Sequence, residues 1–259
     1  MEDESDHPGH RAGNGRGGRL FHRVPNLYEL YGTFYSHLGC LSAAHHGTRG
    51  QTASAAEFSA LFIQIGRWQY YLLALVATGF IIFGRQFIAL WAGSGFEDAY
   101  WITILIILPF TIDLIQNIGL AILQAMNRYD FRAKIYFLTG VLNLLLAIPL
   151  GMHFGGLGCA VATGFSMLMG NGLAMNCFYH RYIGLDIPAF WKQIGKASVS
   201  IGLCLLLGYG INAYTPGDGK FVFFLKIVGY TLLYGVMVYF LAMNADEKSK
   251  VQKIFKRFV

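Results

Sequence analysis

The chain has 259 residues, of which 55% are hydrophobic and only 13% are charged. A soluble domain usually carries about 25% charged residues, so this composition argues against a soluble globular protein and indicates lipid as the solvent. The formal net charge of +6 does not indicate nucleic-acid binding, because the basic residues lie mostly between long apolar runs. We therefore expect membrane lipids, and no nucleic acid, as partners.

Residues 1–57 differ in composition from the rest of the chain. They are rich in Gly, Arg, Ser and His, and their apolar residues follow neither a helical nor a strand period, which predicts disorder. Gly13, Gly15 and Gly18 have the GxGxxG spacing, but no strand precedes them and no helix follows, so no phosphate-binding loop is expected. The histidines of this segment lack the paired spacing of a zinc site. We expect no cofactor and no metal.

From residue 58 onward the composition changes to long apolar stretches. A lipid core about 30 Å thick requires roughly 20 mostly apolar residues per helix. We therefore predict an all-α integral membrane protein in which residues 58–243 form about six transmembrane helices. The predicted spans are residues 65–83, 99–126, 135–154, 156–178, 197–213 and 221–243.

The basic residues alternate between the loops in a way that predicts orientation. One group follows the second, fourth and sixth stretches, whereas the intervening loops hold only Arg85 and Lys220. Because positive loops remain in the cytoplasm, residues 127–134 and the segment after residue 243 are expected inside, and residues 93–98 and 215–220 outside. The members of the first group are Arg128, Arg132, Lys134, Arg181, Lys192, Lys196, Lys248, Lys250, Lys253, Lys256 and Arg257.

Two segments have the pattern of helices that lie on a membrane surface. In residues 244–259, apolar residues recur at helical spacing opposite the basic residues, which predicts an amphipathic interfacial tail. Its apolar residues are Val251, Ile254, Phe255, Phe258 and Val259. Asp186 and Pro188, followed by Phe190, Trp191 and Ile194, predict a shorter helix of this kind before the fifth span.

Asp113 is the first candidate functional residue, because an ionisable group within a span is costly to hold there. It lies four residues after Pro109 and four before Asn117, so all three are predicted to share one helix face. An aspartate beside an amide and a proline-loosened turn favours a proton or cation site. The alternative is a carboxylate paired with a neighbouring helix.

Three further polar residues lie within the predicted spans. Arg67 and Lys226 are candidates for holding a phosphate, or else anchors whose charged ends reach the membrane surface. Asn143 is expected to form an interhelical hydrogen bond more readily than a ligand contact. No catalytic motif such as GxSxG, HExxH or a Walker loop occurs in the sequence, so we do not expect an enzyme.

Several short motifs occur in an order that resembles a known family. Residues 85–93 (RQFIALWAG) resemble the outer-loop signature of bacterial polysaccharide flippases of the O-antigen type, and residues 124–128 (QAMNR) resemble their cytoplasmic turn. Residues 141–144 (VLNL) and 154–163 (FGGLGCAVAT) are similar to a further pair of motifs in those proteins. The resemblance extends over residues 58 to about 215.

This resemblance implies membership of the multidrug/oligosaccharidyl-lipid/polysaccharide exporter superfamily. Its polysaccharide flippases translocate polyprenyl-diphosphate-linked oligosaccharide across the bacterial cytoplasmic (inner) membrane, for lipopolysaccharide O-antigen and other surface polysaccharides. They use twelve to fourteen spans in two lobes and no covalent chemistry. Only about the last six spans are matched, so we expect a C-terminal portion of such a transporter, with residues 1–57 an atypical, out-of-frame segment.

Other functions are compatible with the same features. A cation-coupled multidrug exporter of the same superfamily would give Asp113 greater importance. A small membrane enzyme acting on lipid or glycan would belong to a different class, and so would an assembly subunit that works with the missing lobe or with polysaccharide-assembly proteins.

Overall fold

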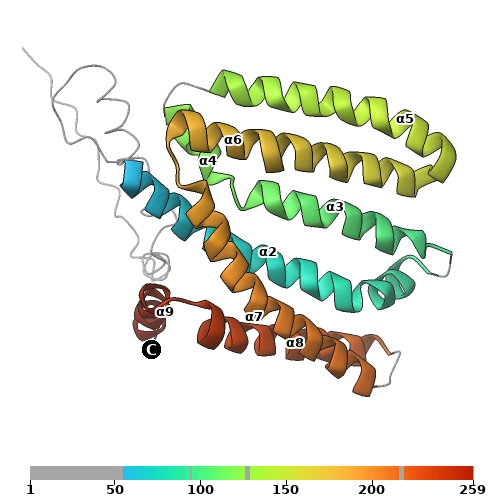
Figure 1. Ribbon diagram of the computed structural model, residues 1–259. Coiled ribbons are helices and arrows are strands. Elements are labelled where there is room, and N and C mark those ends of the chain that lie inside the picture. The colour runs from blue at the N-terminus through green and yellow to red at the C-terminus, as the bar shows by residue number, and fades with distance from the viewer. Residues whose placement is uncertain (1–54, 94, 126–128, 216–218, 259) are drawn as a thin grey trace, which may run out of the picture. The chain divides into compact units, whose positions relative to one another are not determined.

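A computed structural model describes residues 55–93, 95–125, 129–215 and 219–258, and these ranges contain helices and turns but no strand (Figure 1). The chain is therefore all-helical where it is described, as the sequence predicts. Residues 55–57, assigned to the N-terminal segment by composition, already belong to the first described helix. The remaining predictions for residues 1–54 lie outside the described residues. The elements are α2 (Ala55–Trp91), α3 (Asp98–Leu114), α4 (Ile118–Ala125), α5 (Tyr129–Met167), η2 (Leu168–Ala174), α6 (Met175–Phe178), η3 (Tyr179–Ile183), α7 (Ile187–Tyr214), α8 (Lys220–Met237), η4 (Val238–Ala242) and α9 (Ala245–Phe258).

Four of the described helical stretches are long and apolar enough to cross a membrane, and the bent pair α3 and α4 adds a fifth if it is counted as one span. The longest stretch, Tyr129–Ile183, has 55 residues. At 1.5 Å per residue, a straight helix of that length would extend to more than twice the thickness of a lipid core.

Gly155 divides this stretch in two. Its dihedral angles are φ 60° and ψ −139°, a conformation in which the helix cannot continue and which residues with a Cβ rarely adopt. The chain turns back there, and its second half runs beside the first (Figure 1). The close packing of the two halves requires another glycine, because a Cβ on Gly158 would overlap the carbonyl of Leu150. The two halves, on either side of Gly155, correspond to the third and fourth predicted spans, and the total of six spans stays a prediction.

Helix α2 is the centre of the packing. It lies between α3 on one side and α7 and α8 on the other (Figure 1). Tyrosine hydroxyls from α8 reach across to it: Tyr230 donates to the Thr78 hydroxyl at 2.8 Å, and Tyr234 donates to the Tyr71 carbonyl at 2.8 Å. Such buried hydrogen bonds satisfy polar groups where no water is available, and they fix α8 against α2.

The outer faces of the bundle are apolar. On α5, Phe137, Leu144 and Met152 have 74%, 62% and 81% of their surface exposed. Large side chains of this kind would be unfavourable in water, whereas lipid or another apolar helix face accommodates them. Their exposure agrees with a multi-pass membrane protein.

The predicted short surface helix before the fifth span is wrong. Asp186 does cap a helix, since its carboxylate accepts the Ala189 N–H at 3.0 Å, but α7 then continues without a break to Tyr214. The apolar face read as lipid-binding is instead packed in the bundle: Phe190 is fully buried, and its ring lies edge-on to Phe62 at 4.9 Å. Over so few residues, a helix that lies on a membrane and a helix that packs on protein show the same spacing of apolar residues.

Candidate functional site

The second span is broken close to Asp113. Helix α3 ends at Leu114 and α4 begins at Ile118, with a bend of 44° between them. The prediction that Pro109, Asp113 and Asn117 share one face of a continuous helix is therefore wrong, and Pro109 is buried whereas Asn117 is exposed. Asn117 and Gly119, the second residue of α4, are poor helix formers, and the hydrogen bonds around them join residues three apart.

Asp113 instead belongs to a polar cluster formed with α5. The Tyr136 hydroxyl donates to the two carboxylate oxygens at 3.3 and 3.4 Å, and an Arg132 Nη atom lies 3.9 Å from Asp113 Oδ1. Arg132 also donates to the Tyr136 hydroxyl at 2.6 Å, and its guanidinium lies 4.9 Å from the centre of that ring. The side chains of Arg132 and Asp113 are only 12% and 18% exposed. We call Asp113, Arg132 and Tyr136 the polar cluster.

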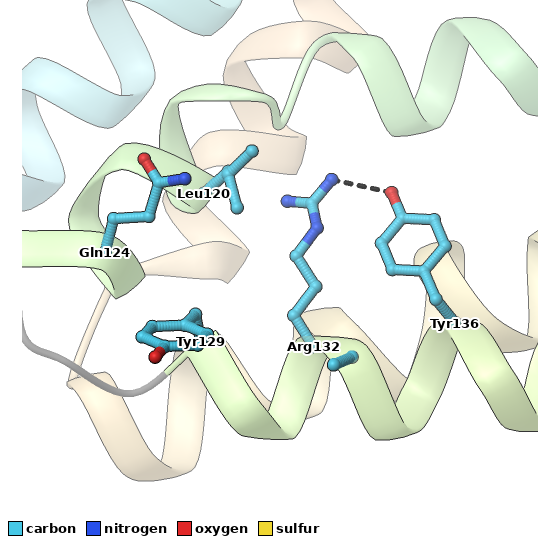
Figure 2. Close-up of a pocket in the computed structure, with 6 residues that line it drawn as sticks. Leu120, Gln124, Tyr129, Arg132 and Tyr136 are labelled. Carbon is cyan, nitrogen blue, oxygen red and sulfur yellow. Dashed lines mark hydrogen bonds between the residues drawn. The ribbon is translucent and has the colours of Figure 1, made fainter.

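A cavity of about 470 Å³ adjoins this cluster. It lies between α4 and the start of α5, with Arg132 and Tyr136 on one side and Leu120 and Gln124 on the other (Figure 2). The remaining lining residues are Tyr129 and Ala133. The cavity therefore combines one guanidinium, two phenol groups and one amide with apolar walls.

This arrangement is chemically suited to an anionic group that carries an apolar chain. A guanidinium forms strong, paired hydrogen bonds with phosphate or carboxylate, and such bonds are stronger where water is scarce. Arg132 is held by one hydrogen bond to Tyr136 and one long ion pair to Asp113, so its guanidinium can still bind a second anion.

The sequence interpretation did not identify Arg132 as a site residue. It was assigned only to the positive loop that sets orientation. The four-residue spacing of Arg132 and Tyr136 on one helix face was a usable signal. Their contact with Asp113, 23 residues before Tyr136, depends on how α3 and α5 pack and has no local signature.

Arg67 is occupied by protein partners. Its guanidinium donates to the Glu247 carboxylate at 2.8 and 2.9 Å, to Gln193 Oε1 at 2.8 Å, to the Tyr71 hydroxyl at 2.6 Å and to the Ala242 carbonyl at 2.9 Å. The residue is 3% exposed. These contacts join α2, α7, η4 and α9, and they leave little capacity for a ligand, so we do not propose Arg67 as a phosphate-binding residue.

Lys226 is buried between α7 and α8. It is 7% exposed, and its ammonium group lies 3.4 Å from Asn212 Oδ1. No carboxylate of the described residues forms an ion pair with it. Lys226 lies on elements other than those that form the polar cluster, so it remains a separate candidate.

Asn143 forms an interhelical hydrogen bond, as expected from the sequence. Its Oδ1 accepts from the Thr163 hydroxyl at 3.3 Å, which links the two halves of α5 across the Gly155 turn. Thr163 also donates to the Cys159 carbonyl at 2.9 Å. The amide therefore contributes to the hairpin, and neither Asn143 nor Asn117 lines the cavity.

The sequence is similar to two curated relatives from the archaeon Haloferax volcanii. "Probable flippase AglR" is 26% identical over 182 residues, which are 68% of this chain and 37% of that protein. "Probable low-salt glycan biosynthesis flippase Agl15" is 24% identical over 227 residues, or 79% of this chain and 46% of that protein. No protein-family profile matches the sequence, and no solved structure matches it.

These similarities are distant but consistent with the fold. The chain spans less than half the length of the curated relatives it matches. Together with the apolar helices, they support a flippase-like family and a multi-pass membrane protein.

Proposed function

We propose that this chain takes part in moving a lipid-linked glycan, a polyprenyl-diphosphate-linked oligosaccharide, across the cytoplasmic membrane for surface polysaccharide biosynthesis. The observation that carries this proposal is the cavity beside Arg132 in a membrane-spanning bundle. The names of the two relatives suggest the kind of substrate, because one of them is called "Probable low-salt glycan biosynthesis flippase Agl15".

Such a substrate has three chemically distinct parts, and the bundle has a surface for each. The diphosphate suits the Arg132 guanidinium, and the apolar side chains of Leu120 and Ala133 suit the first carbons of the lipid. The long lipid chain can remain against the apolar outer faces of the helices. The glycan would extend from the open side of the cavity, where Gln124 and the half-exposed Tyr129 offer hydrogen-bonding groups.

We further propose that the six spans form most of one lobe of a two-lobed transporter. Alternating access requires two bodies that rock about a site between them, and one bundle supplies only one wall. The chain's coverage of less than half of each relative agrees with this. We accordingly expect no glycan translocation when the chain alone is placed in liposomes. From the charges of the loops, we also propose that its C-terminus lies in the cytoplasm. The motif resemblance to bacterial polysaccharide flippases suggests that the glycan is of the O-antigen type.

Asp113 favours one alternative, a cation-coupled multidrug exporter. A carboxylate at a broken span is a reasonable proton or cation site, and cationic drugs would be attracted by it. The nearness of Arg132, however, makes the cavity a poor site for a cation. The two functions therefore predict opposite charge preferences for the same cavity.

The proposal is tested by photo-crosslinking in lipid nanodiscs. A polyprenyl-diphosphate oligosaccharide with a diazirine near the diphosphate is expected to label peptides from α4 and the start of α5. Unlabelled polyprenyl diphosphate should suppress this labelling, whereas equal amounts of phosphatidylglycerol or of a cationic drug should not. Labelling spread over all lipid-facing helices, or suppressed by the drug alone, would contradict the proposed function.

A further inference from the structure

Arg132 has two competing demands on its guanidinium. Its Nη2 atom both donates to the Tyr136 hydroxyl at 2.6 Å and approaches the Asp113 carboxylate at 3.9 Å. The same side chain lines the cavity assigned above to a diphosphate. One cation is thus placed between a fixed carboxylate and the position of an incoming anion.

These two anions cannot both be well stabilised by one arginine. A guanidinium carries a single positive charge, whereas an ionised Asp113 and a diphosphate together carry several negative charges. At the low exposure of this cluster, like charges a few ångströms apart repel strongly, because little water screens them. The ion pair is also long and not bidentate, so it can be displaced by an anion with better geometry.

The other groups around Asp113 do not supply a second positive charge. The titratable groups that face it are Arg132 and Tyr136 from α5 and Tyr179 from η3. The segment η2, which also packs against α3, contains no titratable residue. Helix α2 packs against α3 as well, but its Arg67 is paired with Glu247 and its Arg85 lies over the rings of Tyr100 and Trp101. When Arg132 turns to a phosphate, a proton is therefore the available means of neutralising Asp113 within the described residues.

We propose that Asp113 and the diphosphate of the ligand compete for Arg132, and that Asp113 takes up a proton from the aqueous side when the anion binds. This inference rests on the proposed function, because it assumes a phosphate ligand for Arg132. The step forms one O–H bond at Asp113 and exchanges one ion pair for another. Substrate binding would thereby be coupled to proton uptake at the same site.

The competition predicts that removing the Asp113 charge strengthens anion binding. Asp113→Asn retains the size of the side chain, and the Tyr136 hydroxyl can still donate to its amide oxygen. We expect the variant to bind a diphosphate about fivefold more tightly, the size of effect typical of a partly exposed ion pair. Asp113→Ser provides a second neutral variant of different shape, and it is expected to change affinity in the same direction.

The experiment is titration calorimetry of the full chain in nanodiscs of neutral lipid. The probes are farnesyl diphosphate, which carries an apolar chain, and inorganic pyrophosphate, which does not, so a lipid source and a free-phosphate source are distinguished. Repeating each titration in two buffers of different ionisation enthalpy gives the number of protons taken up. Wild-type protein should take up about one proton more than Asp113→Asn. The difference between the two proteins is used because protons gained or lost by the probe itself are the same in both titrations.

The matched control is Asp130→Asn, which removes an exposed carboxylate from the first turn of the same helix as Arg132. It is expected to behave as the wild type in both affinity and proton count. One result would overturn the competition and leave the proposed function standing. In that case the wild type binds a probe and Arg132→Gln weakens this binding, but neither neutral Asp113 variant strengthens it. No binding of either probe to the wild type would overturn both.

Discussion

Gly155 shows how one residue decides the course of an apolar segment. Its positive φ ends a helix that the composition would otherwise allow to continue, and the space around a Cβ at that position is open. An added methyl group would therefore act through backbone strain and not through a clash. At Gly140, in the first half of the same helix, a Cβ also meets nothing within 4 Å, and no positive φ is required.

Gly155→Ala is accordingly expected to destabilise the protein by about 1–3 kcal/mol. Gly140→Ala, as the control, should leave stability unchanged or slightly higher, since alanine is the better helix former. Denaturant titration of both variants in detergent measures this difference. Equal stability of the two variants would show that the chain does not turn through a left-handed glycine at residue 155.

At the scale of single residues, the sequence predicts some of the contacts correctly and others not. Asn143 was expected to hydrogen-bond between helices and does so, whereas Arg67 was expected at a surface or a ligand and lies in a saturated cluster. The difference has a physical cause. A hydrogen bond between adjacent hairpin arms follows from short-range order, but the partner of Arg67 lies 180 residues away in α9.

At the scale of elements, the cluster around Arg67 joins α9 to the rest of the bundle. Glu247, in the first turn of α9, accepts from Arg67 and from the Asn244 N–H at 2.9 Å. The first turn of the basic C-terminal helix is thereby fixed to α2, while Lys250, Lys253 and Lys256 remain exposed. The tail's role as a helix on an anionic membrane surface stays a prediction.

Breaking this buried pair should be costly. Arg67→Met is expected to lower the free energy of unfolding by about 3–5 kcal/mol, because it leaves the Glu247 charge buried without its partner. The control Arg181→Met removes an exposed arginine and should have little effect. The double variant Arg67→Met with Glu247→Leu should recover much of the loss. If Arg67→Met is no worse than the control in denaturant titration, the ion pair does not hold α9.

The elements themselves were largely predictable, because the length and apolarity of a span are local properties. Each of the six predicted stretches overlaps a helical segment, although α2 and α7 are longer than the stretches predicted for them. The segments are, in order, α2, the pair α3 and α4, the two halves of Tyr129–Ile183, α7, and the pair α8 and η4. The break after Leu114 and the continuity of α7 were not foreseen. Both depend on tertiary packing, which periodicity over a few residues does not contain.

At the scale of the whole molecule, the orientation of the bundle in the membrane is predicted from the charges of its loops. The charge bias of the loops predicts that α9 faces the cytoplasm and that the α2–α3 connection faces outward. Both regions offer exposed positions for labelling, Lys250 in α9 and Glu97 before α3.

In a variant whose native cysteines are replaced by serine, Glu97→Cys should react with an impermeant maleimide added outside intact cells. Lys250→Cys should react only after the membrane is permeabilised. The opposite pattern would reverse the orientation, and with it the side from which the Arg132 cavity receives its ligand.

The central claim is that Arg132 binds the diphosphate of a lipid-linked glycan, and binding affinity tests it most directly. The measurement is the dissociation constant of a polyprenyl-diphosphate disaccharide for the full chain in nanodiscs, obtained for wild type, Arg132→Gln and the control Arg181→Gln. Arg132→Gln should weaken binding by about tenfold or more, the loss expected for a charge-assisted hydrogen bond, while Arg181→Gln should bind as the wild type does. Equal affinity of Arg132→Gln and the wild type would contradict the assignment of this cavity to the diphosphate.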